Sequence, residues 1–110
     1  MTIQNHQMAS HPFLKTLRGD DYYPAGSVDR CGQVLLRLCE RIESDRPADL
    51  TALYVLTHAA TEEINDLQDD DGFDIETVAR EAIAEEFWVV ARAYGFEDAD
   101  IEELVATRDW

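Results

Sequence analysis

Apolar residues recur at intervals of three and four along three long segments of the chain, which is the spacing of one face of an α-helix. The first stripe runs from Val28 to Ile42, the second from Leu50 to Leu67, and the third from Ile75 to Ala93. No segment alternates apolar and polar residues with a period of two, and no two-residue hairpin turn is present. The pattern therefore predicts an all-α protein built on three long helices.

Capping residues predict where these helices begin and end. Ser27 and Asp74 are placed as N-caps of the first and third helices. Asp49 lies where the positive end of the second helix favours a carboxylate, and Gly95 follows the third helix as its C′ residue. Because the connections left between the helices are short, the three are expected to pack antiparallel in sequence order.

Two smaller elements complete the predicted architecture. An apolar cluster within residues 13–17 predicts a single helical turn, and either Asp98 or Asp100 caps a short C-terminal helix. Residues 1–12 show no periodicity and are expected to form a mobile N-terminal tail. Residues 13–110 are then a single helical-bundle domain, a size close to the usual domain length of about 100–150 residues.

Charge divides the chain into two parts. Residues 1–48 carry six basic and six acidic side chains, whereas residues 49–110 carry three arginines and eighteen carboxylates, so the net charge of −15 lies in the second part. Such asymmetry favours either a partner of positive charge or a simple gain in solubility. A surface this acidic argues against binding to a nucleic-acid backbone, and no apolar run approaches the roughly 20 residues of a membrane span.

The two cysteines predict a reducing compartment. Cys31 and Cys39 lie eight residues apart on one predicted helix, so their Cα atoms are about 12 Å apart. A disulfide requires less than about 7 Å, so the two thiols are expected to stay reduced and unreactive. The N-terminal residues show no charged and apolar signal pattern. A cytoplasmic location is the resulting expectation.

Helical geometry places Glu86 in the middle of the apolar arc of the third helix, between Ala82 and Val90. A carboxylate in that position must be paired, hydrogen-bonded or neutral. The partners that we expect from the sequence are Tyr22, Tyr23, His58 and the arginines of the first helix.

A second polar group lies on the flank of the second helix, where His58 and Glu62 are one turn apart. If the second and third helices pack side by side, these residues face Glu86, and a histidine with carboxylates from neighbouring helices is how bundles build metal or acid–base sites. One well-placed histidine without any Glu-x-x-His pair makes a poor metal site. We therefore expect no metal, and structural pairing of Glu86 remains the alternative to a binding role.

The loop Asp20–Pro24 offers two aromatic rings beside two carboxylates. Tyr22 and Tyr23 are candidates either for ligand binding or for covering the end of the bundle, with their hydroxyl groups bonded to a buried acid such as Glu86. We favour the second interpretation.

Known catalytic and cofactor motifs are missing from the sequence. It contains no glycine-rich phosphate loop, no G-x-S-x-G, no H-E-x-x-H and no C-x-x-C. The acidic run Asp69–Asp74 is similar to a calcium loop, but aligning its glycine puts Leu67 and Val78 at two essential ligand positions. We expect no cofactor.

Four segments carry a resemblance to a known family: DDYYP (Asp20–Pro24), LTHAATEEINDLQ (Leu56–Gln68), ETVAREAIAEEF (Glu76–Phe87) and YGFEDADIEELVATRDW (Tyr94–Trp110). They resemble a family of small acidic bacterial proteins classed only as a domain of unknown function. The resemblance covers about residues 13–110. It implies a small bacterial intracellular protein and brings no activity or catalytic residue.

Two functions from different classes follow from these observations. The first is a non-enzymatic binding or accessory protein, in one form an inhibitor or immunity-type protein whose acidic helices cover a basic partner. The second is a small-ligand-binding protein or enzyme with a site built on Glu86, His58 and Glu62. The two differ in whether these residues share a pocket. The sequence leaves open whether the protein is a monomer or a homodimer.

Overall fold

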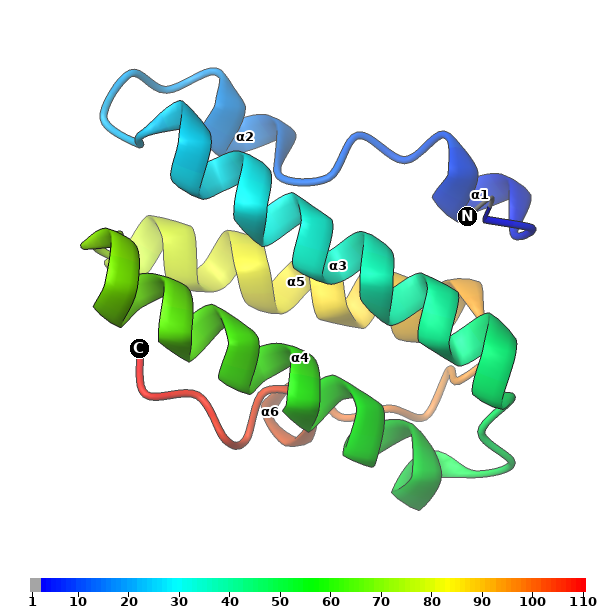
Figure 1. The fold of residues 1–110 in the computed structure, drawn as a ribbon. Coiled ribbons are helices and arrows are strands. Elements are labelled where there is room, and N and C mark those ends of the chain that lie inside the picture. Colours follow the sequence, from blue (N-terminus) through cyan, green and yellow to red (C-terminus); the bar gives the residue numbers. More distant parts are fainter. Residues whose placement is uncertain (1–2) are drawn as a thin grey trace.

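The computed structural model describes residues 3–110, apart from the side chain of Asp71. Helix accounts for 66% of the chain, and the described residues contain no strand. The helices, in chain order, are α1 (His6–Ala9), α2 (Lys15–Arg18), α3 (Ala25–Asp45), α4 (Leu50–Asp71), α5 (Thr77–Ala93) and α6 (Ile101–Leu104) (Figure 1). The all-α prediction is confirmed.

The three long helices run antiparallel in sequence order, as expected (Figure 1). α3 lies along α4, and α5 packs against α3. The short helices pack on two sides of the three long ones. α1 and α2 lie on one side against α5, while α6 lies on the other side against α5 and α4. The protein is therefore an all-α bundle of three long helices closed by short ones.

The predicted apolar stripes form the core. On α3, every residue of the stripe from Val28 to Ile42 is at most 3% exposed. Leu53 and Ile64 of α4 and Ile83 of α5 are fully buried against it. Burying a Val, Leu, Ile or Phe side chain typically contributes about 1.5–3 kcal/mol, so these stripes are the main source of stability.

Two predicted helix starts are wrong, the first by three residues and the second by two. α3 begins at Ala25 with Pro24 as its N-cap, so Ser27 lies inside the helix and is buried. Proline fixes φ near the helical value, and a helix can therefore start directly after Pro24. α5 is capped by Glu76, not Asp74, because the Glu76 carboxylate accepts the backbone N–H groups of Val78 and Ala79.

The other predicted caps agree with the structure. Asp49 caps α4 by accepting the N–H of Ala52 at 2.9 Å. Asp100, one of the two residues considered, caps α6 through the N–H of Glu102, also at 2.9 Å. Gly95 follows α5 with φ +89°, the left-handed conformation that glycine adopts without strain.

The N-terminal segment differs from the expected tail, because the described part of it packs against the bundle. Met8 of α1 is 1% exposed. The Glu43 carboxylate accepts the backbone N–H groups of Gln4 and Asn5 at 2.8 and 3.0 Å, and also the hydroxyl of Tyr94. Burial raises the pKa of the Glu43 carboxyl, but these hydrogen bonds outweigh it and hold the pKa below its usual value. Periodicity could not reveal this segment, since α1 has only four residues.

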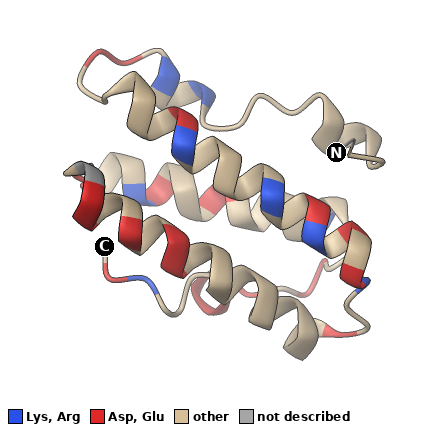
Figure 2. Cartoon of the chain, in the orientation of Figure 1, with Lys and Arg blue, Asp and Glu red and all other residues tan. Residues whose placement is uncertain are grey.

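Charge is distributed as the sequence indicated. Acidic residues gather on the C-terminal half of α4, whereas several arginines follow α3 (Figure 2). Among the described helices, none combines the length and the apolar character needed to cross a membrane.

Candidate functional site

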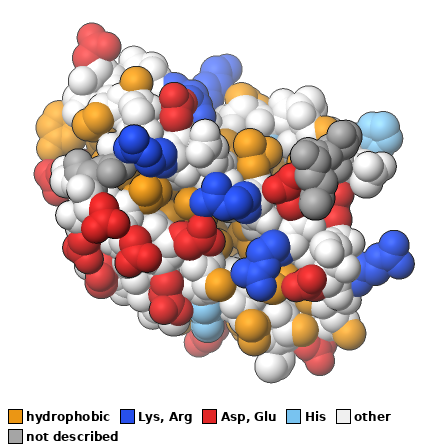
Figure 3. Space-filling view, in the orientation of Figure 1, with side chains coloured by type: hydrophobic (Ala, Val, Ile, Leu, Met, Phe, Trp, Pro, Cys, Tyr) orange, Lys and Arg blue, Asp and Glu red, His pale blue; other side chains and the backbone are white. Residues whose placement is uncertain are grey.

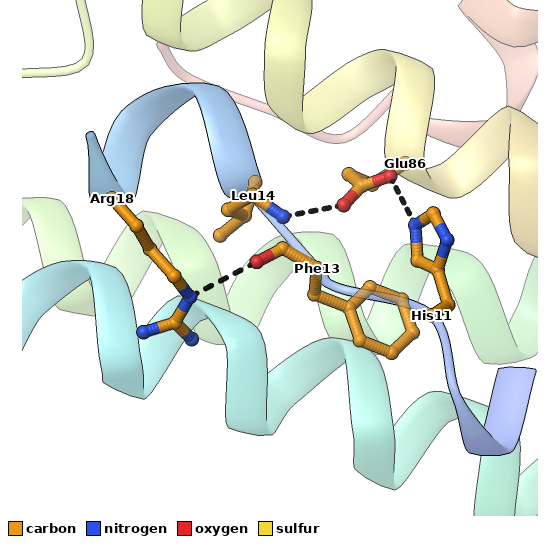
Figure 4. A network of polar contacts seen from close by, with 5 residues as sticks. All are labelled: His11, Phe13, Leu14, Arg18 and Glu86. Carbon is orange, nitrogen blue, oxygen red and sulfur yellow. Dashed lines mark hydrogen bonds and ion pairs between the residues drawn. The ribbon is translucent and has the colours of Figure 1, made fainter. Parts of the chain in front are cut away.

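Glu86 projects from α5 toward the segment between α1 and α2 (Figure 4). It is 8% exposed. Its Oε1 lies 2.9 Å from Nε2 of His11, and its Oε2 accepts the backbone N–H of Leu14 at 2.6 Å. Glu86 is therefore buried and bonded through both oxygens.

The partners of Glu86 are not those predicted from the sequence. Among the described residues its bonds go to His11 and Leu14, whereas Tyr22, Tyr23 and His58 bond other groups. His11 lies within residues 1–12, which the sequence predicts to be a tail, so it is not among the expected partners. A backbone N–H leaves no trace in a sequence. The arc of α5 that holds Glu86 faces the N-terminal segment, which supplies both groups.

Glu86 holds a strained turn. Leu14 is the N-cap of α2 and has φ 58°, a left-handed conformation that costs a non-glycine residue about 1–2 kcal/mol. Its side chain is nearly fully buried, and Nε of Arg18 donates to the carbonyl of Phe13 at 3.1 Å. Glu86 thus accepts the backbone N–H of the N-cap residue itself, as an N3 glutamate does in a capping box. Its role here is structural.

Tyr22 and Tyr23 close the end of the bundle near the start of α5. The Tyr22 hydroxyl donates to Asp74 at 3.3 Å, and the Tyr23 hydroxyl donates to Glu76. The Tyr23 ring also meets Phe73 edge to face. The hydrogen bond to Glu76, followed by burial, raises the pKa of Tyr23 to about 12. The two tyrosines bind surface acids rather than Glu86.

His58 and Glu62 do not join Glu86. Nε2 of His58 donates to the carbonyl of Glu103 at 2.7 Å, while Glu62 is exposed. One and two turns further along α4, Thr61 and Asn65 donate to the carbonyls of Leu104 and Thr107. This flank of α4 holds the C-terminal segment in place. The predicted three-residue site is not assembled, because α6 and the residues after it occupy that flank.

Residues that could ligate a metal are not grouped in the described part of the chain. Within residues 3–110, no set of three or more His, Cys, Asp or Glu side chains is placed to hold a metal ion. Cys31 and Cys39 are free and buried. Burial is the largest cause that raises the pKa of each thiol to about 12.

A groove lies between α5 and the C-terminal segment. It has a volume of about 550 Å³. Its lining residues are Arg80, Glu81, Ala84, Glu85, Trp88, Ile101, Glu102 and Arg108. Trp88 and Ile101 are each 36% exposed. We call this surface the α5–α6 groove.

Two of the three arginines of residues 49–110, Arg80 and Arg108, line this groove, and the third, Arg92, contacts its Trp88. The Arg92 guanidinium stands 4.8 Å from the centre of the Trp88 ring, a cation–π contact. Arg108 lies 5.5 Å from the centre of the Trp110 ring and donates to Glu102 at 3.2 Å. Nε of Arg80 is buried and has no hydrogen-bond partner. The scarce positive charge of the acidic part thus lies in and beside the groove, with Arg92 on the Trp88 ring and Arg108 on the Trp110 ring.

Sequence reasoning missed the α5–α6 groove. One wall of the groove could have been found in the sequence, because Arg80, Ala84 and Trp88 are spaced by four residues along α5 and share a face. The opposite wall comes from Ile101, Glu102 and Arg108, which are distant in sequence. Only the position of α6 beside α5 brings the two walls together.

The fold and this groove define a small all-α bundle with a surface groove of arginine, tryptophan and carboxylate side chains. The chain belongs to the Family of unknown function (DUF5713), whose model matches residues 7–110. The matched range includes His11 and therefore the segment that packs on Glu86. Comparison with curated proteins gives no match, and neither does comparison with solved structures.

Proposed function

We propose that this protein is a non-enzymatic binding protein that holds a basic protein partner at the α5–α6 groove. The observation that carries the proposal is the partly exposed Trp88, which has the Arg92 guanidinium against its ring and shares the groove with Arg80 and Arg108. Tryptophan and arginine are the residue types most enriched at the energetic centres of protein interfaces. In a protein with this much negative charge, their concentration at one groove supports a binding surface.

Charge supports a partner of opposite sign. Glu81 and Glu85 are exposed on the rim of the groove. Further carboxylates cover the C-terminal half of α4, where acidic side chains dominate one edge of the molecule (Figure 3). Such a field speeds the approach of a positively charged protein and discourages acidic ones. An inhibitor or immunity-type protein is one form of this function.

The alternative function, an enzyme or ligand site built on Glu86, His58 and Glu62, has less support. Both oxygens of Glu86 are occupied by His11 and the backbone of Leu14. His58 is bonded to a backbone carbonyl. Of these three residues, only Glu62 is exposed. Two free, buried thiols support a reducing, cytoplasmic setting for the proposed binding function.

Affinity capture with matched variants tests the proposal. Tagged protein is incubated with a lysate of its native cells at low and high salt, in parallel with Trp88→Ala and Val55→Ala. Val55 is an apolar α4 residue that is 64% exposed and lies outside the α5–α6 groove, so it is the control.

We expect a basic protein to be retained by the wild type and by Val55→Ala at low salt, and to be released at high salt. Trp88→Ala is expected to weaken binding by about 30-fold, the effect of losing about 2 kcal/mol at an interface centre. Equal retention by Trp88→Ala and the wild type contradicts the proposed function.

A further inference from the structure

We propose that the α5–α6 groove contains a carboxylate subsite formed by Arg80 and Arg108, and that its occupant is the C-terminus of a protein whose last side chain is apolar. The inference rests on the proposed function, because it names the part of the partner that enters the groove.

Arg80 provides the first evidence. Nε of Arg80 is buried without an acceptor among the described residues, although the segment has eighteen carboxylates and the charge of Arg80 helps to lower the pKa of the Glu76 carboxyl. A buried donor that lacks an acceptor costs free energy, and more so when it belongs to a charged group. An occupant that supplies an acceptor removes that cost.

The shape of the guanidinium specifies the acceptor. Nε and one terminal nitrogen of arginine present two parallel N–H donors, which match the two oxygens of a carboxylate. Nε is buried in the structure and Arg80 lines the groove, so its side chain has to rotate to present this edge to the occupant. A single carbonyl oxygen satisfies only one of the two donors, so a carboxylate is the better match.

Arg108 adds a second positive charge on the opposite wall. Its side chain is 26% exposed and is held by the Trp110 ring and by Glu102. The Glu102 side chain is 73% exposed, so it can move into water when another carboxylate approaches Arg108. Exposed ion pairs of this kind contribute little, and the exchange is therefore not opposed strongly.

The remaining lining selects the group attached to the carboxylate. Ala84, Trp88 and Ile101 give an apolar surface beside the two arginines. A small inorganic anion gains nothing from this surface and is repelled by Glu81 and Glu85 on the rim. A terminal residue with an aromatic or aliphatic side chain fills the apolar part while its α-carboxylate reaches Arg80. A groove of about 550 Å³ has room for such a group.

Two small probes that differ only in the carboxylate test the subsite. N-acetylphenylalanine has a free carboxylate, and N-acetylphenylalaninamide replaces it with a neutral amide. Each is titrated into 15N-labelled full-length protein at constant ionic strength, and the Trp88 indole N–H and Arg80 Nε–H signals are followed. Sodium phosphate serves as the control for a bare anion.

We expect the free acid to shift both signals in a saturable manner and to bind at least about tenfold more tightly than the amide. Arg80→Gln is expected to remove this preference. Arg37→Gln, which changes an exposed arginine of α3 paired with Glu63, is expected to retain it.

Three results overturn the subsite: equal binding of acid and amide, an acid preference that survives in Arg80→Gln, and a lack of shifts with either probe. Equal binding with a Trp88 shift removes the carboxylate subsite but leaves an apolar docking groove, so the proposed function survives it. Loss of partner capture in Trp88→Ala is independent of both probes. Failure of the subsite and failure of the function are thus distinguishable.

Discussion

Replacing Glu86 by alanine removes the carboxylate that joins α5 to the N-terminal segment. The substitution keeps a good helix-forming residue in α5, so its effect reports the lost contacts rather than helix propensity. The first contact is the bond from the Leu14 N–H at 2.6 Å, and the second is the contact with His11 at 2.9 Å. Both contacts disappear together.

The two contacts differ in what their loss costs. The Leu14 N–H is buried and loses its only acceptor, which costs about 1–3 kcal/mol. The His11 side chain is 22% exposed, so water replaces part of its bond and the cost there is about 0–1 kcal/mol. Leu14 also loses the bond that holds its left-handed conformation. We expect Glu86→Ala to destabilise the fold by about 2–4 kcal/mol, a large part of the roughly 5–15 kcal/mol typical of a domain.

Two further variants make the comparison specific. Glu86→Gln retains a side-chain oxygen that accepts from Leu14, so we expect a smaller loss of about 1 kcal/mol. Glu85→Ala changes the neighbouring residue of the same helix, which is exposed. It is expected to stay within about 0.5 kcal/mol of the wild type.

Urea unfolding followed by circular dichroism measures these differences as changes in the free energy of unfolding. The reasoning is refuted if Glu86→Ala lies within about 0.5 kcal/mol of the wild type. It is also refuted if Glu85→Ala is as destabilised as Glu86→Ala, because the loss would then be a property of the helix and not of the buried carboxylate.

Three further predictions concern the rest of the molecule. Cys31 and Cys39, whose pKa values are raised by burial to about 12, should react with a thiol reagent only after unfolding; fast labelling of native protein would contradict their burial. The pKa of Tyr23 is raised to about 12 by Glu76, above its unfolded value of about 10. The contribution of the neutral phenol to stability is therefore complete below about pH 10 and is lost as the pH rises toward 12. An ultraviolet titration should show this phenol ionising at lower pH in Glu76→Gln than in the wild type. Elemental analysis should find far less than one equivalent of transition metal, because His58 is bonded to a carbonyl; one equivalent of zinc, iron or manganese would contradict this.

The long helices were accessible to sequence reasoning because each buries its own stripe. The apolar stripe residues between Val28 and Ile42 repeat with helical spacing, and each of them is buried. The buried position of Glu86 followed from the same geometry. Periodicity depends only on neighbours along the chain, so it predicts which face is buried but not what covers it.

The candidate site depended on what covers each face, and here prediction failed. His11 reaches Glu86 across 75 positions of the sequence, from a segment too short to show periodicity. His58 meets a backbone carbonyl, a group that every residue carries and that no pattern reveals. The groove at Trp88 required the docking of α6 on α5. Each of these is a tertiary contact between distant segments.

Site-specific cross-linking in the native cells tests the central claim, that the α5–α6 groove is where a partner binds. A photoreactive phenylalanine analogue is placed at position 88 in one variant and at position 55 in another, and both cultures are irradiated. We expect the variant with the analogue in place of Trp88 to give a covalent adduct with one basic protein, and the variant with the analogue in place of Val55 to give none. No adduct from position 88, or the same adducts from both positions, would contradict it.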